Sequence, residues 1–441
     1  MAWNQRRQFG RQTPLSVRQQ FGGGHVRWIF FNGVTAAAFL LAALPGRPVM
    51  AQEIPRGETV KSRPKPELDP AGIRMGGFLL YPKVSVSESF DDNIMSAENN
   101  EKSDYITVLG ANAALKSDWS LHSIKLAGDV KVGRYWDSSS EDYNDYRFSS
   151  DGRYDISNNF SVAGGANVFF GHEKRSSLDD ANGLKPAQFS RMSIDGKVNK
   201  TFNKFSINSG LVIDRFNYND VASSTGTINN GDRDRLESMA NLRLGYKFSP
   251  DYENFVQLKV NDRNYKDSID DNGFNRDSHG YDLTTGISFG GTGITFGDIF
   301  AGYRMQSFKD AKLTTAEGVS GGLNITWNAT ALTTLKGGVV RTVEETTTVG
   351  ASGIFRTKFT LSVDHELLRN MILSAKLTST RNDYEGIKRT DNDFAFDFDV
   401  DYKFFRNLYA NFSYGYSQRK SDAQNSDYGK NVYMIQLSSQ L

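Results

Sequence analysis

The chain has 441 residues with 52 basic and 51 acidic side chains, 41 glycines, 10 prolines and no cysteine. Without cysteine, disulfides, a lipidated N-terminal cysteine and thiolate metal sites are excluded. The 30 phenylalanines and 19 tyrosines are atypical of a disordered chain, and the length suits two or three soluble domains or one large all-β domain.

Residues 1–51 have the features of an export signal. They carry six arginines and no acidic residue, and an apolar run from Trp28 to Leu44 precedes the small residues Val49 and Ala51. The run is short and ends at a cleavage signal, so the pattern predicts a signal peptide rather than a membrane anchor. The arginine-rich stretch Arg6–Arg11 leaves a twin-arginine export signal as an alternative.

The chain that remains after cleavage has 46 basic and 51 acidic residues, a net charge near −5. A dispersed negative charge does not suit a nucleic-acid binder, so no nucleic-acid partner is expected. No later apolar run approaches the roughly 18 residues that a membrane helix needs. Residues 52–76 are Pro-rich and charged, which predicts an extended periplasmic tether.

Apolar and polar residues alternate with a period of two from residue 77 to residue 441. In the stretch Asp391–Phe405, for example, Phe394, Phe396 and Phe398 alternate with Asp393, Ala395, Asp397 and Asp399. Successive side chains of a strand point to opposite faces of a sheet, so each such segment has one apolar face and one charged face. In a membrane barrel the apolar face contacts lipid and the charged face lines a wet lumen.

The connections between these segments alternate in length. Short turns such as SNN and FRN are interspersed with longer polar segments such as EKRSSLDDANGLKP (residues 173–186) and NDVASSTGTINNGDRD (residues 219–234). No linker or Pro-rich turn of the kind found between soluble β domains follows residue 77. The pattern predicts one all-β domain over residues 77–441, an antiparallel up-and-down transmembrane barrel of about 18 strands, with 16 possible, in the outer membrane of a Gram-negative bacterium.

The last predicted strand carries a signal for assembly. Tyr433, Ile435, Leu437 and Leu441 keep the alternate spacing that barrel-assembly machinery recognises, although the final residue is Leu where Phe is usual. The expected partners are therefore outer-membrane lipid and the barrel-assembly machinery.

The charged faces supply candidates for residues that line a channel. Charged side chains in a lumen can set solute selectivity, or they can pair across neighbouring strands and hold the lumen in shape. The sequence leaves both interpretations open. The candidates are Lys125, Asp129, Lys131, Arg147, Asp151, Arg153, Arg191, Asp195, Lys197, Arg304, Arg356, Lys358, Asp397, Asp399 and Asp401.

The sequence carries little that is typical of a catalytic site. His172 and His279 fall near the predicted outer rim, where barrel hydrolases place their sites, but no nucleophile motif or paired acid–histidine spacing accompanies them. No phosphate loop or metal-ligand cluster is present either. The protein is expected not to be an enzyme and to need no cofactor or metal.

The first predicted strand resembles the opening strand of a family described as putative beta-barrel porin 2. The resemblance rests on Gly77–Leu80, on Tyr81 and Pro82, and on the acidic exit Asp91–Ile94. The family comprises large bacterial barrels that are often linked to exopolysaccharide synthesis and export. It implies a channel for polysaccharide export with periplasmic export components as partners, and no family site residue is carried over.

Two other functions stay open. A general or ion-selective diffusion porin usually has one long loop folded inward as a constriction, and the segment 219–234 is the nearest to such a loop in length. A structural or adhesive protein would place its function in outer loops, and these loops are short and polar.

Overall fold

The computed structural model describes residues 57–180, 182–290 and 293–441. Contacts divide the chain into two units, Met1–Ala51 and Gln52–Leu441, and all of the described residues belong to the second. The predicted signal peptide lies outside the described residues. No helix in the described part of the chain is long and apolar enough to cross a membrane.

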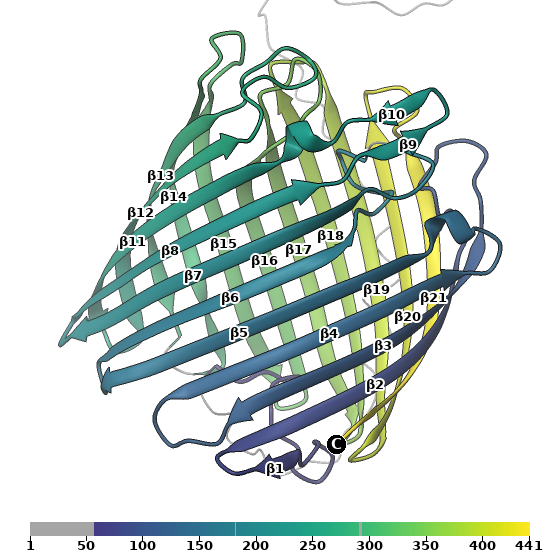
Figure 1. The fold of residues 1–441 in the computed structure, drawn as a ribbon. Coiled ribbons are helices and arrows are strands. Elements are labelled where there is room, and N and C mark those ends of the chain that lie inside the picture. Colours follow the sequence, from purple (N-terminus) through teal and green to yellow (C-terminus); the bar gives the residue numbers. More distant parts are fainter. Residues whose placement is uncertain (1–56, 181, 291–292) are drawn as a thin grey trace, which may run out of the picture. The chain divides into compact units, whose positions relative to one another are not determined.

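Eighteen long strands form the wall of the second unit (Figure 1). In chain order these strands are β2 (Phe78–Asp91), β3 (Asp104–Ser117), β4 (Ser123–Tyr135), β5 (Tyr143–Ser157), β6 (Phe160–His172), β7 (Gln188–Phe202), β8 (Phe205–Tyr218), β11 (Arg235–Ser249), β12 (Tyr252–Tyr265), β13 (Ser278–Phe289), β14 (Thr295–Phe308), β15 (Ala316–Thr330), β16 (Thr333–Glu344), β17 (Gly353–Leu368), β18 (Met371–Glu385), β19 (Thr390–Phe405), β20 (Leu408–Ser421) and β21 (Tyr428–Gln440).

Each wall strand pairs antiparallel with its neighbours in the chain, and the first strand also pairs with the last. The closing pair, β2 with β21, keeps register from Lys83↔Gln440 to Asp91↔Val432. Closure leaves no free edge, which a sheet in lipid requires. The prediction of an antiparallel barrel of about 18 strands is confirmed, and 16 strands is excluded.

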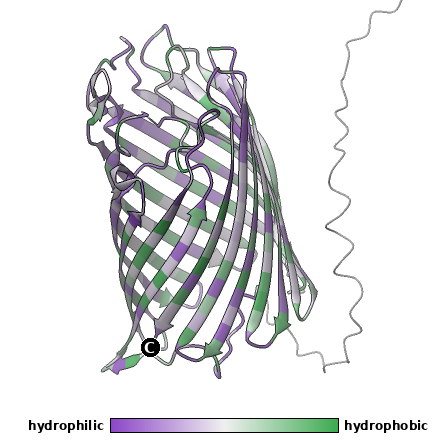
Figure 2. Cartoon of the chain, turned by 90° about the vertical axis from the view of Figure 1, so that its right-hand side faces the viewer, coloured by the Kyte–Doolittle hydropathy of each residue, from purple (hydrophilic) through white to green (hydrophobic). Residues whose placement is uncertain are grey.

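Apolar and polar side chains lie on opposite faces of the barrel wall, as the alternation in the sequence predicts. Figure 2 shows hydrophobic and hydrophilic bands alternating along the strands. Large apolar side chains face outward and are exposed, such as Leu109 (56%), Val319 (70%) and Ile435 (61%). The inward positions of the same strands hold polar residues such as Asn112, Ser320 and Gln436. The arrangement inverts that of a soluble protein, because the apolar surface is the outer one.

The connections are short at one end of the barrel and long at the other. The eight short turns have two to five residues, and this short-turn end also carries the C-terminus and β1 (Ile73–Met75), which pairs with β2. The long-loop end carries the 3-10 turns η1 (Ser139–Glu141) and η2 (Gly231–Arg233) and the hairpin of β9 (Val221–Ser223) with β10 (Gly226–Ile228). The alternation of short and long connections follows the sequence prediction.

Candidate functional site: a polar path between two narrowed ends

One connection crosses the long-loop end of the barrel. The loop bridge, residues 173–187, connects β6 with β7, and its contacts reach β17, β18 and β20. Seven strands separate β6 from β18 along one arc of the sheet, and seven separate β7 from β17 along the other. The loop bridge therefore spans the barrel across a diameter and divides its mouth.

Arginine–carboxylate pairs fix the loop bridge on its own side of the barrel. Arg233 in η2 donates two hydrogen bonds of 2.8 and 2.9 Å to Glu173, and its guanidinium stacks 4.0 Å from the Tyr218 ring. Arg175 donates two hydrogen bonds of 2.8 Å to Glu141 in η1. The charged groups in both pairs are about nine-tenths buried or more, so they are held firmly and are poorly screened by water.

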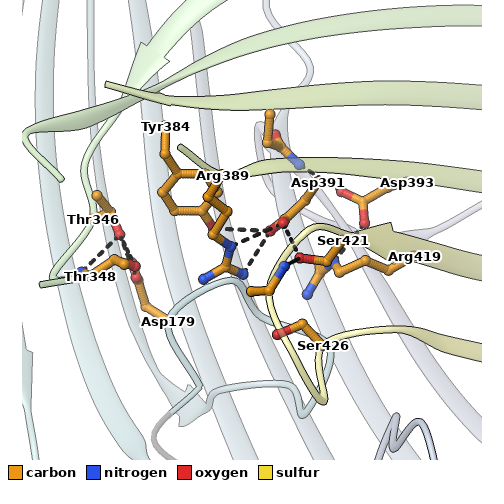
Figure 3. Close-up of polar contacts among 12 residues, drawn as sticks. Asp179, Thr346, Thr348, Tyr384, Arg389, Asp391, Asp393, Arg419, Ser421 and Ser426 are labelled. Carbon is orange, nitrogen blue, oxygen red and sulfur yellow. Dashed lines mark hydrogen bonds and ion pairs between the residues drawn. The ribbon is translucent and has the colours of Figure 1, made fainter. Parts of the chain in front are cut away.

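Different contacts fix the loop bridge on the opposite wall (Figure 3). Thr346, which follows β16, donates its hydroxyl to Asp179 at 2.9 Å. Arg419 of β20 donates to the Ser176 carbonyl at 3.1 Å. Leu178 packs against the buried cluster of Ala351, Ile354 and Tyr384. Both apolar and polar contacts therefore hold the loop bridge in place on this wall.

A second row of ion pairs supports this opposite wall. Arg389 donates two hydrogen bonds to Asp391, whose carboxylate is fully buried and also accepts from Tyr384 and Ser421 (Figure 3). Arg419 donates to Asp393 at 2.7 Å. Such shared carboxylates orient the arginines that face the loop bridge.

The acidic side chains at the tip of the loop bridge have altered pKa values. Burial raises the pKa of Asp179, and the nearby Arg233 and the hydrogen bond from Thr346 offset this only in part. Burial likewise raises the pKa of Asp180, against the attraction of Arg175. Carboxyl groups with raised pKa values favour the neutral form, so the docked loop bridge takes up protons more readily than a solvated one.

A separate segment narrows the short-turn end. The rim segment, residues 57–72, follows the inner wall from β15 to β20: Asn328 donates to the Glu58 carbonyl, Val60 N–H donates to Thr334, and Arg406 donates to the Pro66 carbonyl. Lys65 and Glu366 form a buried ion pair at 3.2 Å. The residues that were predicted to form an extended tether are thus seated against the barrel from residue 57 on.

Three hollows, each bordered by charged side chains, follow one another along the inner wall formed by β18–β21. The hollow at the long-loop end has a volume of about 650 Å³ and is bordered by the loop bridge, Arg389 and Arg419. The middle one, about 410 Å³, is lined by Lys376, Asp397 and Asp399. The third, about 570 Å³, lies between the rim segment and β19–β21. The hollows lie one after another between the two narrowed ends.

All of the predicted channel-lining residues lie on the inward positions of their strands, opposite the exposed apolar residues. By strand they are Lys125, Asp129 and Lys131 on β4; Arg147, Asp151 and Arg153 on β5; Arg191, Asp195 and Lys197 on β7; Arg304 on β14; Arg356 and Lys358 on β17; and Asp397, Asp399 and Asp401 on β19. Only those on β19 border the three hollows. That these residues line an open channel stays a prediction.

Many of these charges have an opposite charge on the next strand. Lys125 lies directly across from Asp151, Asp129 from Arg147, and Lys131 from Asp145. Cross-strand ion pairs form at Arg191–Asp214, Arg304–Asp282, Arg356–Glu344 and Lys376–Asp397. The arrangement favours cross-strand pairing for most candidates. Asp399 forms no ion pair within the described residues.

Sequence reasoning missed the loop bridge. The longer segment 219–234 folds on itself as the β9–β10 hairpin, and the segment 173–187 makes the crossing instead. The signals that could have found it are Leu178, an apolar residue in a polar loop, and the adjacent pair Asp179 and Asp180. His172 contacts Asp145 at 2.9 Å and stacks on Tyr143, whereas His279 is exposed on β13, so the two histidines do not form a common site.

No group of three or more His, Asp or Glu side chains in the described residues could hold a metal ion. The fold is similar to solved bacterial barrels at low identity. The siderophore receptor PirA from Pseudomonas aeruginosa matches with 10% identity and a TM-score of 0.43, covering 86% of this chain and 81% of that one. Pseudomonas aeruginosa OpdO matches with 12% identity and a TM-score of 0.42, covering 82% and 97%.

The comparison with curated proteins gave no match. The family model described as putative beta-barrel porin 2 matches residues 65–441, which include the whole barrel and part of the rim segment. The match covers most of the chain and agrees with the closed 18-strand barrel. The protein therefore belongs to this family of beta-barrel porins.

Proposed function

We propose that the protein is a passive channel of the bacterial outer membrane whose solute moves along the inner wall of β18–β21. The single observation that supports this best is the succession of three hollows, each bordered by charged side chains, between the two narrowed ends. Carboxylates, amides and hydroxyls line them, as in water-filled channels where solutes bind weakly and leave again. The channel is a porin rather than an enzyme.

The solute that we propose is a polysaccharide on its way out of the cell. Linear polymers need a path with repeated weak contacts, and the polar groups of β19–β21 can exchange hydrogen bonds with sugar hydroxyls. Tyr409 borders the hollow at the short-turn end and offers an aromatic face to a sugar ring. The resemblance of the first strand to a family linked to exopolysaccharide export supports the same solute.

The second candidate is a diffusion porin for small solutes. The loop bridge favours it, because a loop that divides the mouth restricts the size of what passes. In that case the charges of Asp397, Asp399 and Asp401 would bias the channel towards cations.

A clean in-frame deletion in the source bacterium, complemented with the wild-type gene, distinguishes the two candidate functions. Polysaccharide is assayed in the medium, on the cell surface and in the periplasm. We expect exported polymer to be lost and periplasmic polymer to accumulate while small-solute uptake stays normal. Unchanged polymer with impaired uptake would overturn the export function and leave the diffusion porin, which single-channel conductance in planar bilayers would then characterise.

A further inference from the structure

The ladder between β15 and β16 stops before either strand ends. The two strands pair only as far as Gly321↔Arg341 towards the long-loop end. Beyond this point β15 stays paired with β14, and β16 stays paired with β17. The stretches that do not pair with each other, residues 316–320 of β15 and 342–344 of β16, are called here the seam. Within the seam, alternate backbone N–H and C=O groups face a neighbouring strand that does not pair with them.

Contacts inside the barrel draw the end of β16 away from β15. Glu345, which follows β16, accepts hydrogen bonds from Arg263 and Tyr265 of β12, and three strands lie between β12 and β16 in the sheet. Phe355 of β17 is only 5% exposed, and a Cβ at Gly318 of β15 would lie 3.9 Å from its ring. These contacts hold the two strands apart, so the seam is a fixed feature of the wall.

Arg341 lies at the point where the ladder ends. It faces outward, as does Thr357 opposite it on β17, because the next residue of β17, Lys358, faces the lumen. The Arg341 guanidinium lies 4.8 Å from the centroid of the Phe355 ring, and its Nε atom is buried with no hydrogen-bond partner. A cation on the lipid face of a barrel is costly unless an anion accompanies it.

The carboxylates near the seam do not neutralise Arg341. Glu344 and Asp383 are each paired with another arginine. Glu317 lies on β15 two outward positions nearer the rim than the end of the ladder. Within the described residues Arg341 forms no ion pair, so its charge is available to an anion from outside the chain.

The outward surface changes from polar to apolar at Arg341. The outward row that contains Arg341 continues into Thr357 and Arg381. The next outward row towards the short-turn end is apolar and holds Leu323, Val339 and Phe359. Val319, two residues from the end of the ladder on β15, is also apolar and is 70% exposed. Arg341 therefore lies at the border of the apolar band, the level at which lipid headgroups meet the hydrocarbon.

We propose that the seam binds a phosphate-bearing lipid of the outer leaflet. Arg341 holds the phosphate, because a guanidinium presents a planar pair of N–H groups to phosphate oxygens, and unpaired backbone N–H groups of the seam supply further donors. An acyl chain of the same molecule lies against Val319 and the apolar row below Arg341. The site is on the outer face of the wall, so it does not depend on which solute the channel carries.

Native mass spectrometry of the detergent-purified mature protein tests the site with diphosphoryl lipid A as the probe and inorganic phosphate as competitor. Arg341→Gln removes the cation, and Val319→Asp keeps Arg341 but places a carboxylate beside it. Arg381→Gln is the matched control, because Arg381 lies in the same outward row but is already paired with Asp383. We expect each of the first two variants to bind lipid A about tenfold more weakly than the wild type, and the control to bind it as the wild type does.

Folding of each variant is checked by heat-modifiable gel migration. If either folded variant, Arg341→Gln or Val319→Asp, binds lipid A as tightly as the wild type, the site is overturned. An equal loss in Arg341→Gln and in the Arg381→Gln control would also overturn it, because it would show attraction to the basic rim as a whole. Displacement of lipid A by an equimolar amount of inorganic phosphate would overturn the lipid as the ligand and leave a site for an adventitious ion only.

Discussion

The two ends of the barrel are narrowed by different means. At the long-loop end, the loop bridge is attached to the wall at both of its own ends and crosses a diameter, held by almost fully buried arginine–carboxylate pairs. At the short-turn end, the rim segment follows one arc of the wall, and several of its ion pairs are partly exposed, such as Arg369–Glu67 with both side chains about half exposed. Exposed pairs contribute little, so the rim segment should leave its seat more easily.

Removing the loop bridge should have the largest effect on the conductance of the channel. Replacing residues 174–186 by two glycines should raise the single-channel conductance severalfold, because it removes the element that divides the mouth. Replacing residues 224 and 225, at the tip of the β9–β10 hairpin, by two glycines keeps the hydrogen bond from the Leu184 N–H to the Ala222 carbonyl and should change conductance little. Both variants are checked for folding by heat-modifiable gel migration. A loop-bridge deletion with wild-type conductance would show that the restriction lies elsewhere.

The buried pair Lys65–Glu366 is the contact expected to hold the rim segment most firmly. Glu366→Gln leaves the Lys65 ammonium buried without its charge partner, which should weaken the seating of the rim segment by about 3 kcal/mol. The readout is the rate of trypsin cleavage after Lys61 in the folded barrel. The double variant Lys65→Met/Glu366→Leu removes both charges and should restore most of the protection. Unchanged cleavage in Glu366→Gln would mean that the remaining contacts suffice.

The loop bridge should respond to pH. Burial raises the pKa of Asp179 in the docked loop above its ordinary value of 3.8, so the docked form binds more protons. Docking therefore strengthens as pH falls through the raised pKa and gains nothing further below about 3.8. Arg233 and Thr346 oppose the shift, and Glu173 adds to it. We expect conductance to fall as pH is lowered from neutral towards about 3.8, and Asp179→Asn to lose most of this dependence. If the variant keeps the pH dependence of the wild type, protonation of Asp179 is not the cause of the change in conductance.

The smallest effect is expected at an exposed ion pair of the short-turn end. Arg74 on β1 contacts Asp118 at 2.6 Å, with side chains 64% and 45% exposed. Arg74→Ala should leave both the melting temperature and trypsin cleavage after Lys61 unchanged, since solvent and salt screen such pairs. A clear loss of protection would show that exposed contacts also hold the rim segment, and would remove the contrast with the loop bridge.

The sequence by itself determined the barrel. Period-two alternation fixes which side chains face out, because consecutive strand residues point to opposite faces, and it placed Asp397, Asp399 and Asp401 on the inner wall. The alternation of short and long connections gave the strand order, since each strand pairs with its neighbours in the chain. These features are local, and local patterns can be read from a sequence.

Only the tertiary structure decided what occupies the barrel. The loop bridge depends on Arg419 and Ser176, which are 243 residues apart in sequence, and the rim segment depends on Asn328 and Glu58, which are 270 apart. Neither contact leaves a periodic pattern in the sequence. Each one joins an irregular segment to the part of the wall that the closed barrel places beside it. Loop length is a poor predictor of the loop that narrows the mouth for the same reason. The longer segment 219–234 pairs with itself at β9 and β10. The slightly shorter loop bridge carries the apolar Leu178, which packs against an apolar cluster on the opposite wall.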